Sequence, residues 1–257
     1  MDLDNNMHDG ITFFSDPIDV SMADSWYEVS HADHFWIKRR FAVMDKMIDG
    51  IDLQRMKWFD VGCGAGLLQE HCSKTYGLAV DGADLNIVAL AKNPSGPKQT
   101  FCYDILEQRA EMHEAYDIIS VLDVIEHIED EFRFVEALLF HLKKGGFLLV
   151  NVPANQKMYS RYDIEAGHKR RYSSKDVFRI CNQHGLATHS WTYWGLPLLP
   201  VLLARNLVVA CVAKEKVIEK GFSPPSKTIA RLLGALAGAE KIPNHLTGTS
   251  LMFVLRK

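Results

Sequence analysis

The sequence lacks the features that would mark a nucleic-acid-binding, secreted or disulfide-stabilised protein. Its 257 residues carry 29 lysines and arginines against 32 aspartates and glutamates, so it has no basic excess for nucleic acid. The first ten residues, MDLDNNMHDG, have no apolar core typical of a secretory signal. The cysteines are few, odd in number and without C-x-x-C spacing, which favours free thiols in a reducing cytoplasm: Cys63, Cys72, Cys102, Cys181 and Cys211.

The sequence also lacks a clear transmembrane segment. Its strongest apolar stretch, LPLLPVLLARNLVVACVA (196–213), contains Arg205, Asn206 and two prolines. A membrane span needs about 20 apolar residues, and a central arginine costs roughly 2.5–3.5 kcal/mol in a bilayer. We therefore expect no transmembrane helix. A helical lid, a homodimer surface and a peripheral membrane contact remain open, in that order of preference.

What the sequence does contain is a regular alternation of apolar segments. Apolar residues make up 47% and charged residues 24%, the balance of an ordinary globular protein. Strands are predicted at 57–61, 78–83, 99–103, 116–122 and 146–152, with helices between them, and further strands at 186–194 and 248–255. The pattern predicts an α/β fold, a Rossmann-like, doubly wound and mostly parallel seven-stranded sheet with helices on both faces.

The first strand runs into a glycine turn, in the segment WFDVGCGAGL (58–67). Glycine permits positive φ and close approach of a ligand to the backbone, and the helix that follows begins with free N–H groups. The spacing G-x-G-x-G is shorter than the G-x-G-x-x-G of dinucleotide-binding proteins. The candidate ligand-binding residues of this turn are Asp60, Gly62, Cys63, Gly64 and Gly66.

Acidic residues follow the next three strands. Asp84 is favoured over Asp81 as the carboxylate that accepts ribose hydroxyl groups, and Leu85 could pack on an adenine ring. Asp104 and Ile105 are candidates for the adenine edge. Leu122 and Asp123 end the fourth strand and should line the same crevice.

Several of these segments together resemble the motifs of class I S-adenosylmethionine-dependent methyltransferases. They are DVGCGAG, the Asp84 position, YDIISVLDVIEHIED (116–130) and LKKGGFLLVNVP (142–153). The small-molecule branch, related to the ubiquinone-biosynthesis O-methyltransferases, is the most similar. HFWIKRR (34–40) and GHKRRYS (167–173) resemble a subgroup of secondary-metabolite and cell-envelope pathways. The resemblance, over about residues 30–195, implies S-adenosyl-L-methionine as cofactor and S-adenosyl-L-homocysteine as product.

The chain divides into three expected parts: a helical cap over the active site (1–50), the cofactor-binding core (51–195) and an apolar segment with the final helix and strand (196–257). Residues 1–20 are expected to be mobile and residues 214–227 to form a mobile connection. In the cap, Tyr27, Phe35 and Trp36 could pack or line an acceptor pocket, whereas Trp26 is expected to pack. Arg40 could bind the methionine carboxylate of the cofactor or belong to a solvated turn, 38–40.

A long polar loop at 153–173 is the predicted acceptor-binding segment, because loops of this length inside a domain are usually functional or disordered. Its candidate acceptor contacts are Asn155, Tyr159, Tyr162, His168, Arg171 and Tyr172. The alternative is that ion pairs fix the loop while the tyrosines pack beneath it.

The expected reaction is methyl transfer to a hydroxyl group or amine of a small-molecule acceptor. A hydroxyl gains from a general base, for which His168 is the first candidate, His127 the second and Glu165 a weak third. His127 is expected rather to order its loop while contacting the cofactor. Asp123, Glu126 and His127 are too closely spaced for a convincing metal site, so no metal is expected.

Three alternatives to this reaction stay open. The first is N- or C-methylation of a lipid-like or sugar-linked acceptor. The second is a nicotinamide-dependent oxidoreductase, which would share the fold. The third is a cofactor-binding partner without catalytic activity, since binding motifs do not prove turnover.

Overall fold

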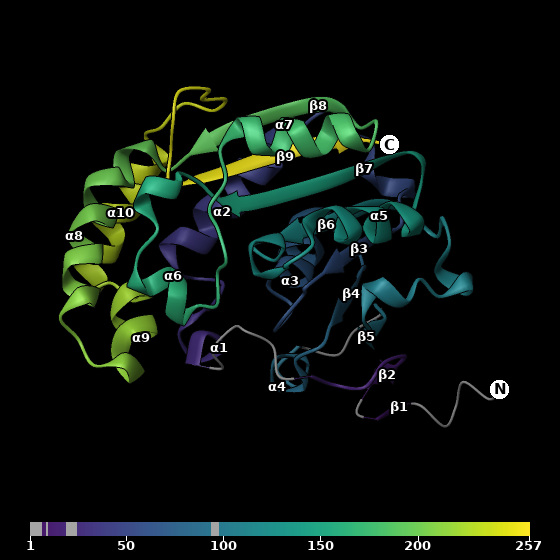
Figure 1. Ribbon diagram of the computed structural model, residues 1–257, viewed down its shortest axis with the longest axis horizontal. Coiled ribbons are helices and arrows are strands. Elements are labelled where there is room, and N and C mark those ends of the chain that lie inside the picture. Colours follow the sequence, from purple (N-terminus) through teal and green to yellow (C-terminus); the bar gives the residue numbers. More distant parts are fainter. Residues whose placement is uncertain (1–6, 9, 19–24, 94–97) are drawn as a thin grey trace.

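The computed structural model describes residues 7–8, 10–18, 25–93 and 98–257, built around one nine-stranded sheet (Figure 1). The strand order is β1-β2-β5-β4-β3-β6-β7-β9-β8. From β3 the chain moves outward through β4 and β5, then returns to the other side of β3 with β6. The bounds are β3 Trp58–Val61, β4 Val80–Asp84, β5 Thr100–Cys102, β6 Tyr116–Leu122, β7 Leu142–Pro153, β8 Ala187–Trp194 and β9 Ser250–Arg256.

This topology confirms the predicted doubly wound α/β fold. Strands β2 to β7 of the sheet are parallel to one another, and β9 is antiparallel to both of its neighbours. Successive strands leave β3 in opposite directions, so the switch point lies where β3 ends, at the glycine turn. Ligands of open α/β sheets bind at such a point.

Two short strands extend the sheet beyond the seven that were predicted. Strand β1 (Met7–His8) pairs with β2 (Ile11–Phe13), and β2 lies parallel to β5. Ile11 is buried in a small cluster with Leu90 and Cys102. Residues 1–20 are predicted to be mobile until something covers them; in the described part Ile11 is buried and β2 lies between β1 and β5, so this segment packs on the sheet itself.

Helices cover both faces of the sheet. On one face lie α5 (Glu131–His141) and α7 (Ser174–Gln183), which bury residues such as Phe134, Leu138 and Ile180. On the other face lie α2 (Phe35–Met47) and α3 (Leu67–Tyr76). The start of α7 follows from a capping box in which Ser173 and Asp176 bond each other's backbone amides.

A separate group of helices gathers at the end of the sheet toward which β7 points (Figure 1). It consists of α6 (Arg161–Glu165), α8 (Leu199–Ala210), α9 (Val217–Phe222) and α10 (Lys227–Gly238). The prediction of a mobile connection at 214–227 is wrong, since it contains α9. Val217 and Ile218 are buried there against Tyr162 and Val209, and this burial stabilises the helix although its sequence is short and charged.

The outer surface of this helical group exposes apolar side chains. Leu207 of α8 is 74% exposed and Leu232 of α10 is 65% exposed. Nowhere in the described parts of the chain does a helix combine the length and apolar character required to span a bilayer. The homodimer surface, the peripheral membrane contact and the functional division into three parts stay predictions.

Candidate functional site

The glycine turn between β3 and α3 has the backbone conformation that its sequence predicts. Gly62, Gly64 and Gly66 have φ values of 76°, 52° and 77°, in the region that favours glycine. A Cβ at Gly62 would lie 2.3 Å from Val124 Cγ2, and one at Gly64 would lie 3.0 Å from the ring of Tyr27. A larger residue at Gly62 or Gly64 would therefore collide with the side chain that packs over the turn.

The amides of the turn are already used to hold its shape. Those of Gly62 and Cys63 donate to Ala83 O, at 2.8 and 3.0 Å, and that of Gly66 donates to Cys63 O. Helix α3 then begins with Gly66 as its N-cap and no capping side chain. The amides in the first turn of α3 are consequently the ones suited to bind a ligand.

Asp84 at the end of β4 is tied directly to this turn. Its Oδ2 accepts a hydrogen bond from Gly64 N and its Oδ1 from Asn86 N, both at 2.9 Å. Each carboxylate oxygen can accept a second hydrogen bond, so Asp84 can also bind hydroxyl groups. Burial raises the pKa of Asp84. Asp81 instead accepts hydrogen bonds from Gln99 N and Tyr116 Oη, in agreement with the preference for Asp84.

Asp60 lies beneath the turn, inside the sheet. Its Oδ1 accepts a hydrogen bond of 2.6 Å from Ser120 Oγ, and burial raises the pKa of Asp60 to about 7. Cys63 is buried as well, and burial raises the pKa of its thiol well above the usual value. These contacts make Asp60 and Cys63 supports of the turn.

The residues predicted to contact the adenine, Asp104, Ile105 and Leu85, differ in how they could reach a ligand. Asp104 Oδ1 accepts a hydrogen bond from Leu106 N at 2.9 Å and starts a short 3-10 helix. The side chain of Ile105 is buried in the main hydrophobic core, so only its backbone can meet a ligand. Leu85 packs against the cluster around Leu90.

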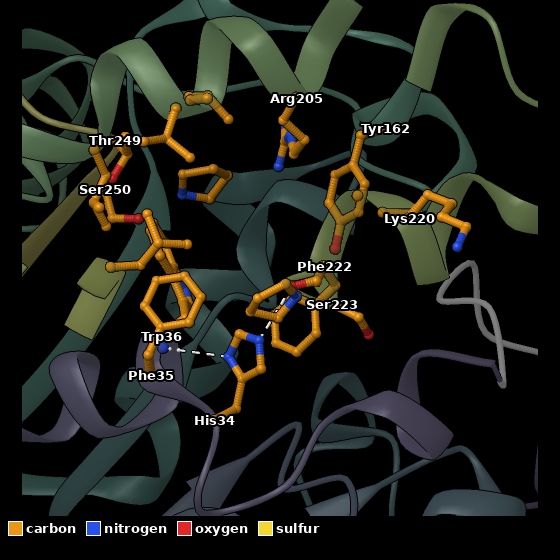
Figure 2. A pocket seen from close by; sticks show the side chains of 18 of the residues that line it. His34, Phe35, Trp36, Tyr162, Arg205, Lys220, Phe222, Ser223, Thr249 and Ser250 are labelled. Carbon is orange, nitrogen blue, oxygen red and sulfur yellow. Dashed lines mark hydrogen bonds between the residues drawn. The ribbon is translucent and has the colours of Figure 1, made fainter. Parts of the chain in front are cut away.

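A cavity of about 660 Å³ lies between the helical group and the sheet, at the ends of β6 and β7 and the start of β9. Its wall includes α2, the end of β6, the loop that follows β7, and helices α8 to α10 (Figure 2). The structure brings these sequence-predicted residues together on the wall: Phe35, Trp36, Arg40, Asp123, Tyr162, His168 and Arg171.

Arg40 and Asp123 form an ion pair on this wall. Arg40 Nη1 lies 2.7 Å from Asp123 Oδ2, and Asn151 Nδ2 donates to Asp123 Oδ1 at 2.7 Å. Arg40 is 6% exposed, so the alternative of a solvated turn is wrong for this residue. Asp123 has φ 61°, a conformation rare outside glycine and often found at functional sites.

His168 is held by a buried carboxylate. Its Nδ1 lies 2.9 Å from Asp163 Oδ1, which also accepts a 2.7 Å hydrogen bond from Arg171 Nε. Although burial opposes it, these two hydrogen bonds lower the pKa of Asp163, which is therefore ionised. Nδ1 must donate to this carboxylate, which leaves Nε2 of the neutral ring as a proton acceptor.

Glu126 lies beside His168, with its Oε1 3.9 Å from His168 Nε2. The carboxyl group is fully buried, and neither oxygen has a hydrogen-bond partner among the described residues. Burial, reinforced by the charge of Asp123, raises the pKa of Glu126 well above its usual value. Burial thus favours the neutral, protonated form of Glu126 on the cavity wall.

His127 packs edge-on against His168, with ring centroids 4.9 Å apart. Burial lowers the pKa of His127 to about 3, so its ring is neutral. Donor atoms of Glu126, His127 and His168 lie within 4.8 Å of one another, a set that could hold a metal ion. The absence of an obligatory metal stays a prediction.

Four predicted acceptor contacts lie elsewhere. Tyr172 is buried in the core, where its hydroxyl donates to Glu131 Oε2 at 2.9 Å. Tyr159 Oη donates to His168 O at 2.6 Å, and the Asn155 side chain accepts from Lys157 N, so both hold the loop. Tyr27 lies against Gly64 at the glycine turn.

Many residues of the cavity wall were not predicted as site residues, among them Trp26, Glu126 and Arg205. Trp26 packs on Phe222, as expected, with ring centroids 5.7 Å apart, and also lines the cavity. For Arg205 the only signal in the sequence is a charged residue inside an apolar segment. For Glu126 the signal in the sequence is its position next to His127, a candidate site residue.

Comparisons with known proteins agree with this geometry. A family model described as a methyltransferase domain matches residues 24–191. A ubiquinone biosynthesis O-methyltransferase of Ruegeria pomeroyi is 30% identical over 175 residues, which cover 65% of this chain and 63% of that protein. One of Shewanella is 26% identical over 145 residues, covering 52% and 61%. The chain therefore matches about three fifths of the length of these relatives.

Solved structures agree on the fold. A S-adenosylmethionine-dependent methyltransferase of Archaeoglobus fulgidus superposes with a TM-score of 0.56 at 15% identity, covering 86% of this chain and 93% of that one. The glycine turn, the uncapped start of α3 and Asp84 fit S-adenosylmethionine, the cofactor of this class. The chain belongs to the methyltransferase-domain family, has the fold of S-adenosylmethionine-dependent methyltransferases, and over the matched residues is similar to the ubiquinone biosynthesis O-methyltransferases.

Proposed function

We propose that this enzyme methylates a hydroxyl group of a small-molecule acceptor, with His168 as general base, in a biosynthetic or secondary-metabolite pathway. The observation that carries the proposal is the Asp163–His168 pair, in which His168 lines a large cavity that Arg40 and Asp123 also line. When bound, the cofactor supplies an electrophilic methyl group on its sulfonium. The remaining requirements fall on the side chains of the cavity.

The first requirement is removal of the hydroxyl proton. Asp163 fixes the ring of His168 and stabilises the positive charge that develops when Nε2 takes up a proton. Arg171 holds Asp163 from the other side and keeps it ionised. Glu165 is less suited to this role, because its carboxylate lies 3.7 Å from Lys214 Nζ, at the surface.

The second requirement is to hold the cofactor at the strand ends. Asp84 is proposed to bind the ribose, the first turn of α3 and Arg40 the methionine part, and Asp104 with Leu85 the adenine. Leu122, Asp123 and His127 would border the sulfonium. Arg40 Nε has no partner among the described residues, so it can bind a carboxylate while Nη1 stays with Asp123.

The third requirement is to exclude water while the acceptor is bound. Helices α8, α9 and α10 cover the cavity on the side away from the sheet. Phe35, Trp36 and Phe222 form apolar parts of the wall (Figure 2). A largely apolar cavity favours an aromatic or aliphatic acceptor body with a few polar groups. An amine acceptor is the second candidate, since it needs no base once it is unprotonated.

Calorimetry with S-adenosylmethionine and S-adenosylhomocysteine tests cofactor binding, and turnover against phenols, amines and carboxylic acids tests the acceptor class. We expect phenols to be methylated and His168→Ala to slow this reaction selectively. Methylation of amines alone would replace the hydroxyl proposal. Cofactor binding without turnover of any acceptor would favour a non-catalytic role.

A further inference from the structure

Arg205 is a half-buried cation on the cavity wall that no carboxylate of the described residues pairs with. It projects from α8 into the cavity, over the ring of Tyr162, with its Cζ 4.3 Å from the ring centroid (Figure 2). Its Nε and Nη2 both point to Asn206 Oδ1, at 3.3 and 2.9 Å. Within the described ranges no aspartate or glutamate forms an ion pair with Arg205.

The other two arginines of the cavity wall are different. Arg40 is paired with Asp123 at 2.7 Å and Arg171 with Asp163 at 2.7 Å. A buried charge costs much free energy unless it is paired and hydrogen-bonded. The amide of Asn206 and the face of an aromatic ring compensate the guanidinium of Arg205 only in part.

The surroundings of Arg205 strengthen its attraction for an anion. Apolar residues of the same helix and of its neighbours line the cavity here, among them Pro200, Val208 and Leu233. Burial lowers the pKa of Arg205 to about 10, yet it stays protonated at neutral pH. In so apolar a setting a charge-assisted hydrogen bond is stronger than in water.

We propose that Arg205 binds an acidic group of the acceptor, a carboxylate or a phosphate monoester, while the apolar body of the acceptor fills the cavity. The acceptor is thus an organic acid that places its reacting group toward His168. This inference rests on the proposed function for its acceptor, and it makes the apolar segment 196–213 a determinant of specificity as well as a cover.

The test compares matched ligands that differ only in charge. Hydroxyphenylalkanoic acids, their primary amides and the corresponding alkyl phosphates are titrated into the enzyme saturated with S-adenosylhomocysteine, and their dissociation constants are measured by calorimetry. We expect an acid to bind about 10- to 100-fold more tightly than its amide. Comparing the carboxylate with the phosphate series identifies which acidic group is recognised.

Two substitutions and one control locate the effect. Arg205→Gln should abolish the preference for the acid and leave the binding of the amide unchanged, whereas Arg205→Lys should keep part of it because the charge remains. Arg231→Gln removes the same charge from the exposed face of α10, outside the cavity wall. It should change neither the affinity for the acid nor the affinity for the amide. For acidic acceptors that are methylated, Arg205→Gln should raise KM and leave kcat nearly unchanged.

Equal binding of acid and amide by the wild-type enzyme would overturn this inference, even if Arg205→Gln failed to fold. So would an Arg205→Gln variant that weakened both ligands equally. Acids that bind through Arg205 but are never methylated would instead count against the proposed function and leave Arg205 as an anion-binding residue.

Discussion

His34 stacks on the ring of Phe222 and bonds to the carbonyl group of the same residue. The ring centroids lie 4.0 Å apart at 13°, and His34 Nε2 is 3.1 Å from Phe222 O (Figure 2). His34 Nδ1 accepts a hydrogen bond from Trp36 N, so Nε2 must carry the proton and donate. One neutral imidazole thus caps α2 and fixes the end of α9 at the cavity wall.

This arrangement makes stability depend on pH. Burial lowers the pKa of His34 to about 4, from an ordinary value of 6.5. Between these values the unfolded chain binds a proton that the folded protein does not, so stability falls as the pH drops through this window. The contribution of His34 is about 2 kcal/mol between pH 7.5 and pH 5.

His34→Gln should therefore be less stable than wild type at pH 7.5 but lose less stability on acidification. Urea unfolding at the two pH values measures this difference. His189→Gln, at an exposed position of β8, should keep the wild-type pH dependence. An unchanged pH dependence in His34→Gln would show that the proton uptake occurs elsewhere.

Asp84→Ala should weaken the binding of S-adenosylmethionine by about 10- to 100-fold, because hydrogen bonds to a charged group are worth about 1.5–3 kcal/mol. The substitution also releases the Gly64 amide that Asp84 now binds. Calorimetry measures the loss, and circular dichroism checks the fold. The exposed Asp49→Ala serves as control. A dissociation constant within twofold of wild type would remove Asp84 from the cofactor site.

His168→Ala should leave cofactor affinity unchanged and lower kcat by roughly 10²- to 10⁴-fold, the usual contribution of a general base. The remaining activity should rise with pH toward the pKa of the acceptor hydroxyl, because the acceptor must then ionise without help. Turnover measured from pH 6 to pH 10 tests both statements. His127→Ala, which removes the neighbouring ring, should lower kcat less than His168→Ala does. If His127→Ala lowered kcat more, His127 would be the better candidate for the base.

Local patterns sufficed to predict the seven strands β3 to β9 and the glycine turn, but not β1 and β2. Strand β6 begins and ends where predicted, because its segment is rich in apolar residues, and helix α3 follows the glycine turn as expected. The relation of Asp84 to the turn follows from the order of parallel strands. Such features depend on neighbours in sequence or on adjacent strands, which the alternation of elements already specifies.

The cavity could not be predicted in this way, because its wall joins segments that are distant in sequence. His34 meets Phe222 across 188 positions, and Tyr162 packs under Arg205. Tyr172 lies in the same polar segment as Tyr162, but its side chain points into the core and its hydroxyl donates a hydrogen bond to Glu131. Which tyrosine faces the cavity depends on the packing of α6 against α8 and α9, and periodicity carries no information on that packing.

Glu126 provides a test of the expectation that no metal is required. A protonated Glu126 is closely matched in shape and charge by glutamine, so Glu126→Gln should keep cofactor affinity and most of the activity. A metal ligand would behave differently, since an amide is a poor substitute for a carboxylate on a cation such as zinc.

Removal of divalent ions should accordingly leave turnover unchanged. Dialysis against EDTA followed by activity measurements, with and without added Mg²⁺ or Zn²⁺, checks this, and His168→Ala provides the reference for loss of the base. The opposite result would be a wild-type activity that EDTA abolishes and a divalent ion restores, with no such restoration in Glu126→Gln. It would assign Glu126, His127 and His168 to a metal site, since their donor atoms lie within 4.8 Å of one another. His168 would then be a ligand, and the proton of the acceptor would have to leave by another route.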